Sequence, residues 1–95
     1  MPTATSKQKF WKKIHYMSEE DFEYYLREYN EELKQNPSAI YKTKAFHLIS
    51  GYIRYHNPIC KCGWGKTRLV HHTKYKYPIQ KENLIPLCYQ CHGRE

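Results

Sequence analysis

Apolar and polar positions follow a helical period through the first half of the chain. One apolar stripe recurs at steps of four, three and four residues and comprises Phe22, Leu26, Tyr29 and Leu33. Ser18 precedes this stripe as a candidate N-cap, with Asp21 three residues on, and carboxylates fill the first turn. The Asn36-Pro37 pair ends the pattern. The sequence therefore predicts one helix between Ser18 and Asn36.

A second apolar stripe predicts a second helix over residues 38–57. Ser38 is its candidate N-cap, and Asn57-Pro58 ends it. Two helices joined by a short turn form an antiparallel hairpin over residues 18–57. Residues 1–17 form a basic, partly disordered N-terminal segment: we expect a disordered start over 1–8 and a short amphipathic helix over 10–17.

From residue 58 the pattern changes to short apolar and β-branched runs, with glycines at Gly63 and Gly65. We expect a strand over 69–72, a loop over 75–79 and a helix that begins near Pro86, because proline is favoured in a first helical turn. The region 60–64 is expected to supply a short hairpin partner for the strand. The fold class predicted is α+β.

Charge is divided unevenly along the chain. The net charge is +7, yet seven of the nine acidic residues lie between positions 19 and 32. The positive charge thus gathers elsewhere, including residues 58–95, which favours an acidic partner such as nucleic acid. A merely soluble basic protein stays open as an alternative. No apolar leader opens the chain and no run approaches membrane-spanning length, so we expect a cytoplasmic protein without a membrane partner.

The four cysteines form two close pairs, Cys60 with Cys62 and Cys88 with Cys91. In a protein that is not exported, paired cysteines indicate metal ligands rather than disulfides. Four thiolates suit the tetrahedral coordination of a structural zinc ion. Free thiols or a two-ligand remnant remain the alternatives.

Histidines lie close to these cysteines in sequence. His71 and His72 are adjacent, and on a strand they point to opposite faces. By themselves they favour one exposed and one packed side chain over a functional site. Ten residues separate Asn83 from His72, and His92 comes directly after Cys91, so zinc would fix the direction of His92.

The run His-His-x10-Asn-x8-His, together with Glu-Asn-Leu-x-x-Leu-Cys-x-x-Cys-His, resembles the HNH endonuclease family over about residues 58–95. The resemblance implies a small, zinc-stabilised, treble-clef-like ββα-metal unit after the helical hairpin, within one compact domain. The chain departs from the family in its first cysteine pair. The usual first Cys-x-x-Cys pair would place a cysteine where this chain has Ile59.

The resemblance also implies roles for individual residues. His71 and His92 would bind a catalytic divalent cation (Mg²⁺, Mn²⁺, Ni²⁺ or Zn²⁺). His72 would be the general base that takes a proton from water, a task that suits imidazole because its pKa lies near neutrality. Asn83 would hold that base in place. The four cysteines would bind the structural zinc.

DNA is the substrate that the resemblance implies. Phosphate contacts are expected from Arg68, Lys74, Lys76 and Lys81. The function expected is that of an HNH DNA endonuclease or nickase of low sequence specificity, in a bacterial or phage-infected cell or on a mobile element. One alternative is a zinc-stabilised nucleic-acid-binding or regulatory module with an inactive site. Pairing through the helical half, with a second copy or a partner protein, also stays open.

Overall fold

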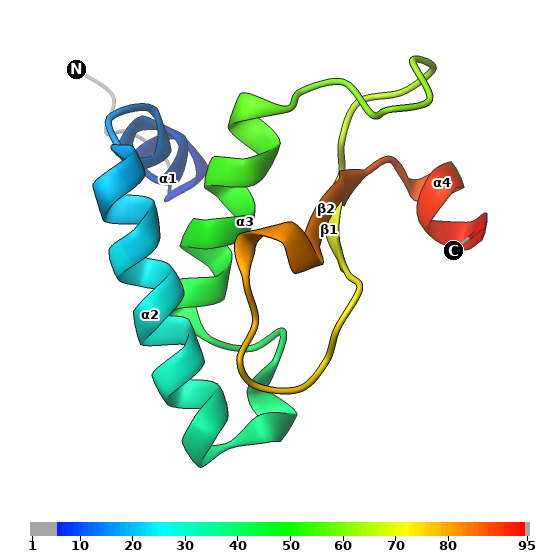
Figure 1. Cartoon of the computed structure of the whole chain (residues 1–95). Coiled ribbons are helices and arrows are strands. Elements are labelled where there is room, and N and C mark those ends of the chain that lie inside the picture. The colour runs from blue at the N-terminus through cyan, green and yellow to red at the C-terminus, as the bar shows by residue number, and fades with distance from the viewer. Residues whose placement is uncertain (1–5, 95) are drawn as a thin grey trace.

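The computed structural model describes residues 6–94, and in this range the chain is α+β, as predicted. The α-helices are α1 (Ser6–His15), α2 (Glu19–Gln35), α3 (Lys44–His56) and α4 (Tyr89–Arg94). The strands β1 (Leu69–His72) and β2 (Leu84–Leu87) form a two-stranded antiparallel sheet, and the 3-10 turns are η1 (Pro37–Ala39) and η2 (Lys81–Asn83). The sheet lies between α3 and α4 (Figure 1).

Helix α2 begins where the sequence predicts. The Ser18 hydroxyl accepts a hydrogen bond from the Asp21 amide, and the Asp21 carboxylate accepts one from the Ser18 amide, each at 3.1 Å. This reciprocal capping box satisfies donors that would otherwise lack partners at the helix start. At the other end the Asn36 amide donates to the Glu32 carbonyl at 2.8 Å, and the helix stops before Pro37.

Helix α3 begins later than the sequence predicts. Ser38 caps no helix, because it lies in the 3-10 turn η1 and its hydroxyl bonds the side chain of Asn36 at 2.7 Å. The N-cap is Thr43, whose hydroxyl accepts from the Phe46 amide at 2.9 Å. The predicted end before Asn57-Pro58 is confirmed. The longer connection gives room for Tyr41, which lies next to His72 at 4.9 Å between ring centroids.

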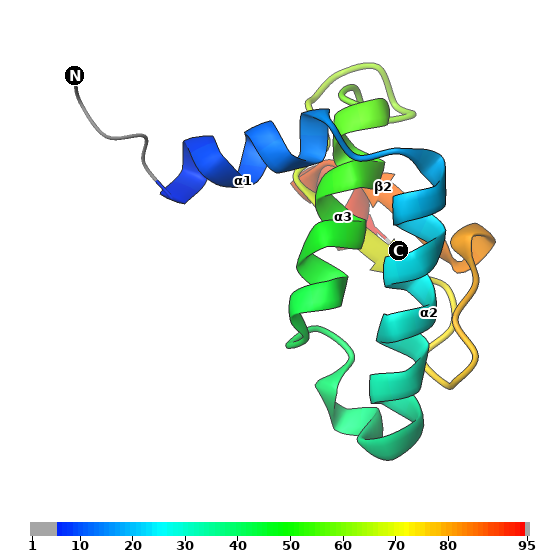
Figure 2. The ribbon, with the colours of Figure 1, turned by 90° about the vertical axis from the view of Figure 1, so that its left-hand side faces the viewer.

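Helix α1 is longer than expected and includes residues 6–8, which were assigned to a disordered start. Residues 1–5 of that start and Glu95 lie outside the described residues. Phe10 and Ile14 fix α1 against Gly51 of α3, where an added Cβ would lie 2.7 Å from Phe10 Cζ. This contact holds α1 against α3, while the N-terminal end of α1 points away from the rest of the protein (Figure 2).

The sheet corrects two expectations. β1 pairs with β2, with Val70 opposite Pro86 and His72 opposite Leu84, and not with residues 60–64. Residues 60–65 instead form a separate turn, closed by an isolated bridge between Ile59 and Lys66. Pro86 lies within β2, so no helix begins there, and α4 starts at Tyr89. Proline is tolerated because both strands of a two-stranded sheet are edge strands.

Two apolar clusters flank the sheet. The larger cluster joins α1, α2 and α3 to Val70, Ile79 and Leu84. The smaller cluster surrounds the cysteines and includes Leu87, with Leu69 packed against it. Alternate residues of β1 therefore face α3 and α4, which separates the environments of His71 and His72. No helix in residues 6–94 is long and apolar enough to cross a membrane.

Candidate metal and catalytic centre

The four cysteines converge on one point between the 60–65 turn and the start of α4. The sulfur atoms of Cys60, Cys62, Cys88 and Cys91 all lie within 4.8 Å of one another, and the Cys62 and Cys88 sulfurs are 3.8 Å apart. Four sulfurs around zinc at the usual bond length of about 2.3 Å lie about 3.8 Å apart. The cluster can therefore hold a metal ion such as zinc. The shorter Cys-x-Cys spacing is accommodated by Gly63, whose φ of 76° lets its amide return to the Cys60 carbonyl at 2.9 Å.

The sulfurs differ in acidity. Backbone amides of Cys62 and Cys88 lower the pKa of the Cys60 thiol to about 6. Hydrogen bonds with the sulfurs of Cys60 and Cys62 raise the pKa of Cys91 to about 12. Cys60 therefore ionises more readily than Cys91. A bound metal ion requires thiolates, so its binding would release protons from this cluster.

His71 and His92 face each other across β1 and α4. Their ring centroids are 5.4 Å apart, with an interplanar angle of 70°. Two imidazoles bound to one cation at about 2.1 Å place their ring centres about 5 Å apart. The structure therefore brings the two rings into edge-on contact at a separation of this order. Among residues 6–94 no aspartate, glutamate, cysteine or further histidine joins it to make a three-ligand group.

His72 lies on the other face of β1, as strand alternation predicts, and is buried at 1% exposure. Its Nε2 lies 3.0 Å from the hydroxyl of Tyr29, which itself donates to the Ile40 carbonyl at 2.7 Å. Burial raises the pKa of Tyr29, so this hydroxyl keeps its proton. Nε2 of His72 must then be the protonated nitrogen and Nδ1 the one with the free lone pair.

Nδ1 of His72 is buried and has no hydrogen-bond partner. Burial, with a smaller contribution from His71, lowers the pKa of His72 to about 4. Aromatic rings enclose the imidazole: Tyr41 meets it edge-on at 4.9 Å, Phe46 lies at 5.1 Å and Tyr75 stacks over it at 5.8 Å. The structure thus brings His71 and His92 together and places His72 in a separate, enclosed position.

Asn83 closes the loop that follows His72. Its side-chain oxygen accepts from the Gln80 amide at 2.9 Å, and its side-chain nitrogen donates to the Thr73 hydroxyl at 3.3 Å. The Thr73 amide donates to the Asn83 carbonyl at 2.8 Å. Asn83 therefore restrains the residue directly after His72 and makes no hydrogen bond to the imidazole itself.

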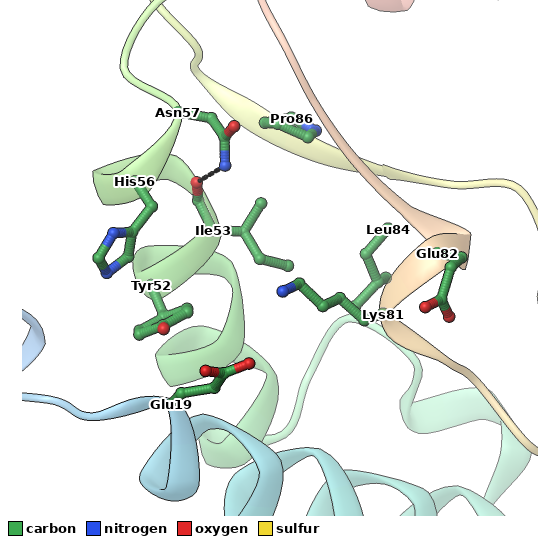
Figure 3. A pocket seen from close by; sticks show the side chains of 9 residues that line it. All are labelled: Glu19, Tyr52, Ile53, His56, Asn57, Lys81, Glu82, Leu84 and Pro86. Atoms are coloured by element: carbon green, nitrogen blue, oxygen red, sulfur yellow. Dashed lines mark hydrogen bonds between the residues drawn. The ribbon is translucent and has the colours of Figure 1, made fainter.

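The expected phosphate-binding residues do not share one surface hollow. Arg68 lines a hollow with His92, whereas Lys81 lines a different one with Glu19 and Glu82. In Figure 3 the Lys81 side chain extends toward Ile53 of α3. The other two lysines, Lys74 and Lys76, are exposed in the loop between the strands.

Sequence reasoning missed the tyrosines around His72. The apolar stripe of α2 predicted burial of Tyr29, but not the partner of its hydroxyl, which lies 43 residues away. Tyr41 and Tyr75 carried no signal, because both sit in irregular segments without periodicity. A buried tyrosine hydroxyl needs a polar partner, and that requirement was the available clue.

The chain matches no protein-family model, no curated protein and no solved structure in comparisons with known proteins.

Proposed function

We propose that this protein is a divalent-metal-dependent DNA endonuclease or nickase of the HNH type. The observation that carries the proposal is the separation of 5.4 Å between the His71 and His92 rings. His71 lies on β1, and His92 lies on α4 directly after Cys91 of the cysteine cluster. A structural zinc bound by that cluster would therefore hold His92 in position opposite His71. The net charge of +7 suits a polyanionic substrate.

His71 and His92 would hold the catalytic cation. A cation held by two protein ligands has open positions for a phosphate oxygen and would stabilise the charge that develops during hydrolysis. His72 would accept the proton of the attacking water through Nδ1, which has a free lone pair in the tautomer fixed by Tyr29. Asn83 would act as a positioning residue by restraining the loop after His72.

The proposal requires that water reach Nδ1 of His72. Tyr41 and Tyr75 cover the imidazole, and both are about half exposed, at 52% and 55%. Displacement of Tyr75 would open the side of the ring over which it stacks. Hydration would also return the pKa of His72 from about 4 toward its ordinary value of 6.5, where imidazole is a more effective base.

A second candidate function is a zinc-stabilised DNA-binding module that does not cut. The burial of His72 at 1% exposure favours it, because an enclosed imidazole bonded to Tyr29 also serves as a core residue. This candidate shares the cysteine cluster and the charge with the first. It differs in assigning no chemistry to His71, His72 and His92.

Plasmid cleavage distinguishes the two candidates. Zinc-loaded protein is incubated with supercoiled plasmid and Mg²⁺, Mn²⁺, Ni²⁺ or Zn²⁺. We expect nicked or linear products, reduced about 100-fold or more by His72→Ala and by His92→Ala. His56→Ala is the matched control, because His56 is an exposed histidine on α3 outside the site. Plasmid that stays intact with every cation, although the protein is folded and binds DNA, would establish the second candidate.

A further inference from the structure

A hollow of about 500 Å³ lies between α3 and β1 and reaches His92. We call it the basic groove. Its charged and polar lining includes Arg54 and His47 of α3, Arg68 next to β1, and Tyr41, while Leu69 and Val70 provide apolar surface. Ligand sites commonly have volumes of about 300–1,000 Å³, so the groove can admit a group of nucleotide size.

The basic groove contains two arginines and two histidines and no acidic residue. Other hollows in the described part of the chain are different. The one in Figure 3 is lined by Lys81 together with Glu19 and Glu82, and another, between α2 and α3, includes Glu28 and Glu32. Positive charge in the basic groove is therefore not compensated locally, and the groove favours an anion.

The Arg54 side chain is held in place before any ligand binds, and Arg68 is fixed through its backbone. The Arg54 guanidinium lies 5.3 Å over the Trp11 ring, and its Nε donates to the Ser50 carbonyl at 3.4 Å. The backbone of Arg68 is fixed by its amide, which donates to the Leu87 carbonyl at 2.9 Å, while its side chain is exposed. A guanidinium suits phosphate because it presents paired N–H donors in a planar fork. Prior ordering reduces the entropy lost on binding.

The groove adjoins the candidate cation pair through His92, which lines it and faces His71. Tyr41 adds a half-exposed ring that can pack against a sugar or base. A ligand with a phosphate beside Arg54 and Arg68 would thus extend toward the His71–His92 pair. A phosphodiester chain has this combination of anionic and planar groups.

We infer that the basic groove binds the DNA backbone beside the scissile phosphodiester, with Arg54 and Arg68 as phosphate contacts. The inference rests on the proposed function in one respect, namely that the bound strand is the one presented to His71 and His92. It assigns part of DNA binding to the helical half of the chain, outside the segment that carries the HNH motif.

Binding is measured by fluorescence anisotropy with a labelled DNA duplex and the zinc-loaded full chain, without added divalent cation or chelator. Arg68→Gln is expected to weaken binding about tenfold and to reduce the slope of log affinity against log salt by about one. The double variant Arg54→Gln/Arg68→Gln should lose more DNA affinity than Arg68→Gln alone. Arg27→Gln, the same charge change in a hollow that contains Glu19 and Glu23, is the matched control and should stay within about twofold.

His47→Glu guards against a folding artefact. His47 is exposed and lines the basic groove, so the change adds a negative charge there and does not alter Arg54, which lies over Trp11. It should weaken binding about tenfold or more at an unchanged melting temperature. Arg68→Gln and His47→Glu variants that bind DNA as tightly as Arg27→Gln would overturn the inference.

Cleavage of plasmid, scored separately, distinguishes this inference from the proposed function. If the wild type does not cut but groove variants lose binding, the groove assignment stands and the nuclease proposal fails. If the wild type cuts and the groove variants bind and cut like Arg27→Gln, the groove assignment fails and the nuclease proposal stands.

Discussion

Replacement of Tyr29 by phenylalanine isolates the hydrogen-bond chain that holds His72. The Tyr29 hydroxyl donates to the Ile40 carbonyl at 2.7 Å and accepts from His72 Nε2 at 3.0 Å. The substitution keeps the ring, which stacks on Phe46 at 5.4 Å, and removes the oxygen alone. The Nε2–H of His72 and the carbonyl of Ile40 then both lose the hydroxyl that they share as a partner.

The expected cost follows from the burial of the two groups. An unsatisfied buried donor costs about 1–3 kcal/mol, and His72 is only 1% exposed. The Ile40 carbonyl is partly buried and adds less, so we expect Tyr29→Phe to lower the free energy of unfolding by about 2–3 kcal/mol. Tyr24→Phe is the matched control, because Tyr24 lies on the same helix at 50% exposure; its cost should stay below about 0.5 kcal/mol.

A double-mutant cycle with His72→Phe shows whether the two residues act through one bond. With both partners removed, the buried N–H that Tyr29→Phe leaves unsatisfied no longer exists, so the effects should be non-additive by about 1 kcal/mol. The four proteins are unfolded with urea in the presence of zinc near neutral pH, and circular dichroism reports the transition. Additivity within about 0.3 kcal/mol, or a Tyr29→Phe effect no larger than that of Tyr24→Phe, would refute the hydrogen-bond chain from His72 through Tyr29 to Ile40.

Three further predictions concern stability. Because burial lowers the pKa of His72 from 6.5 to about 4, the unfolded chain binds the proton first; the free energy of unfolding should therefore fall by about 3 kcal/mol as pH drops from 6.5 to 4. His72→Phe should remove that part of the pH dependence in parallel urea titrations, and identical profiles would contradict the assignment. Removal of zinc by a chelator should lower the melting temperature by about 10 °C or more, since the cysteine cluster carries the smaller core; an unchanged melting temperature would show that the cluster binds no structural ion. Gly51→Ala, whose Cβ would lie 2.7 Å from Phe10 Cζ, should destabilise the docking of α1 by about 1 kcal/mol, whereas Gly93→Ala meets nothing within 4 Å and should not; hydrogen exchange in α1 that is equal in both variants would contradict this reasoning.

Local signals in the sequence were sufficient for features that depend on neighbours along the chain. The capping box at Ser18 set the start of α2, and alternation along β1 placed His71 and His72 on opposite faces. Cysteine spacing predicted one cluster although Cys60 and Cys91 lie far apart in sequence. Each of these depends on a fixed period or on strong ligand chemistry, so no tertiary information was needed.

Features that depend on distant partners were not predictable in the same way. Pro86 was expected to begin a helix, yet it lies in β2. Pairing of this segment with β1 outweighs the local preference of proline for a first helical turn. The partner of His72 is on a helix 43 positions earlier, and nothing around His72 specifies Tyr29. The distribution of Arg68 and Lys81 over separate hollows likewise follows from the tertiary arrangement.

The enclosed His72 sharpens the choice between the two candidate functions. A histidine used only for packing would be costly here, because a buried nitrogen without a partner costs about 1–3 kcal/mol and Nδ1 has none. Phenylalanine offers similar aromatic packing against Phe46 and Tyr41 without that polar atom. An unpaired acceptor is, however, the form in which a general base must be held before it meets its proton. The free lone pair at Nδ1 is what proton transfer would use, whereas packing alone would not need it.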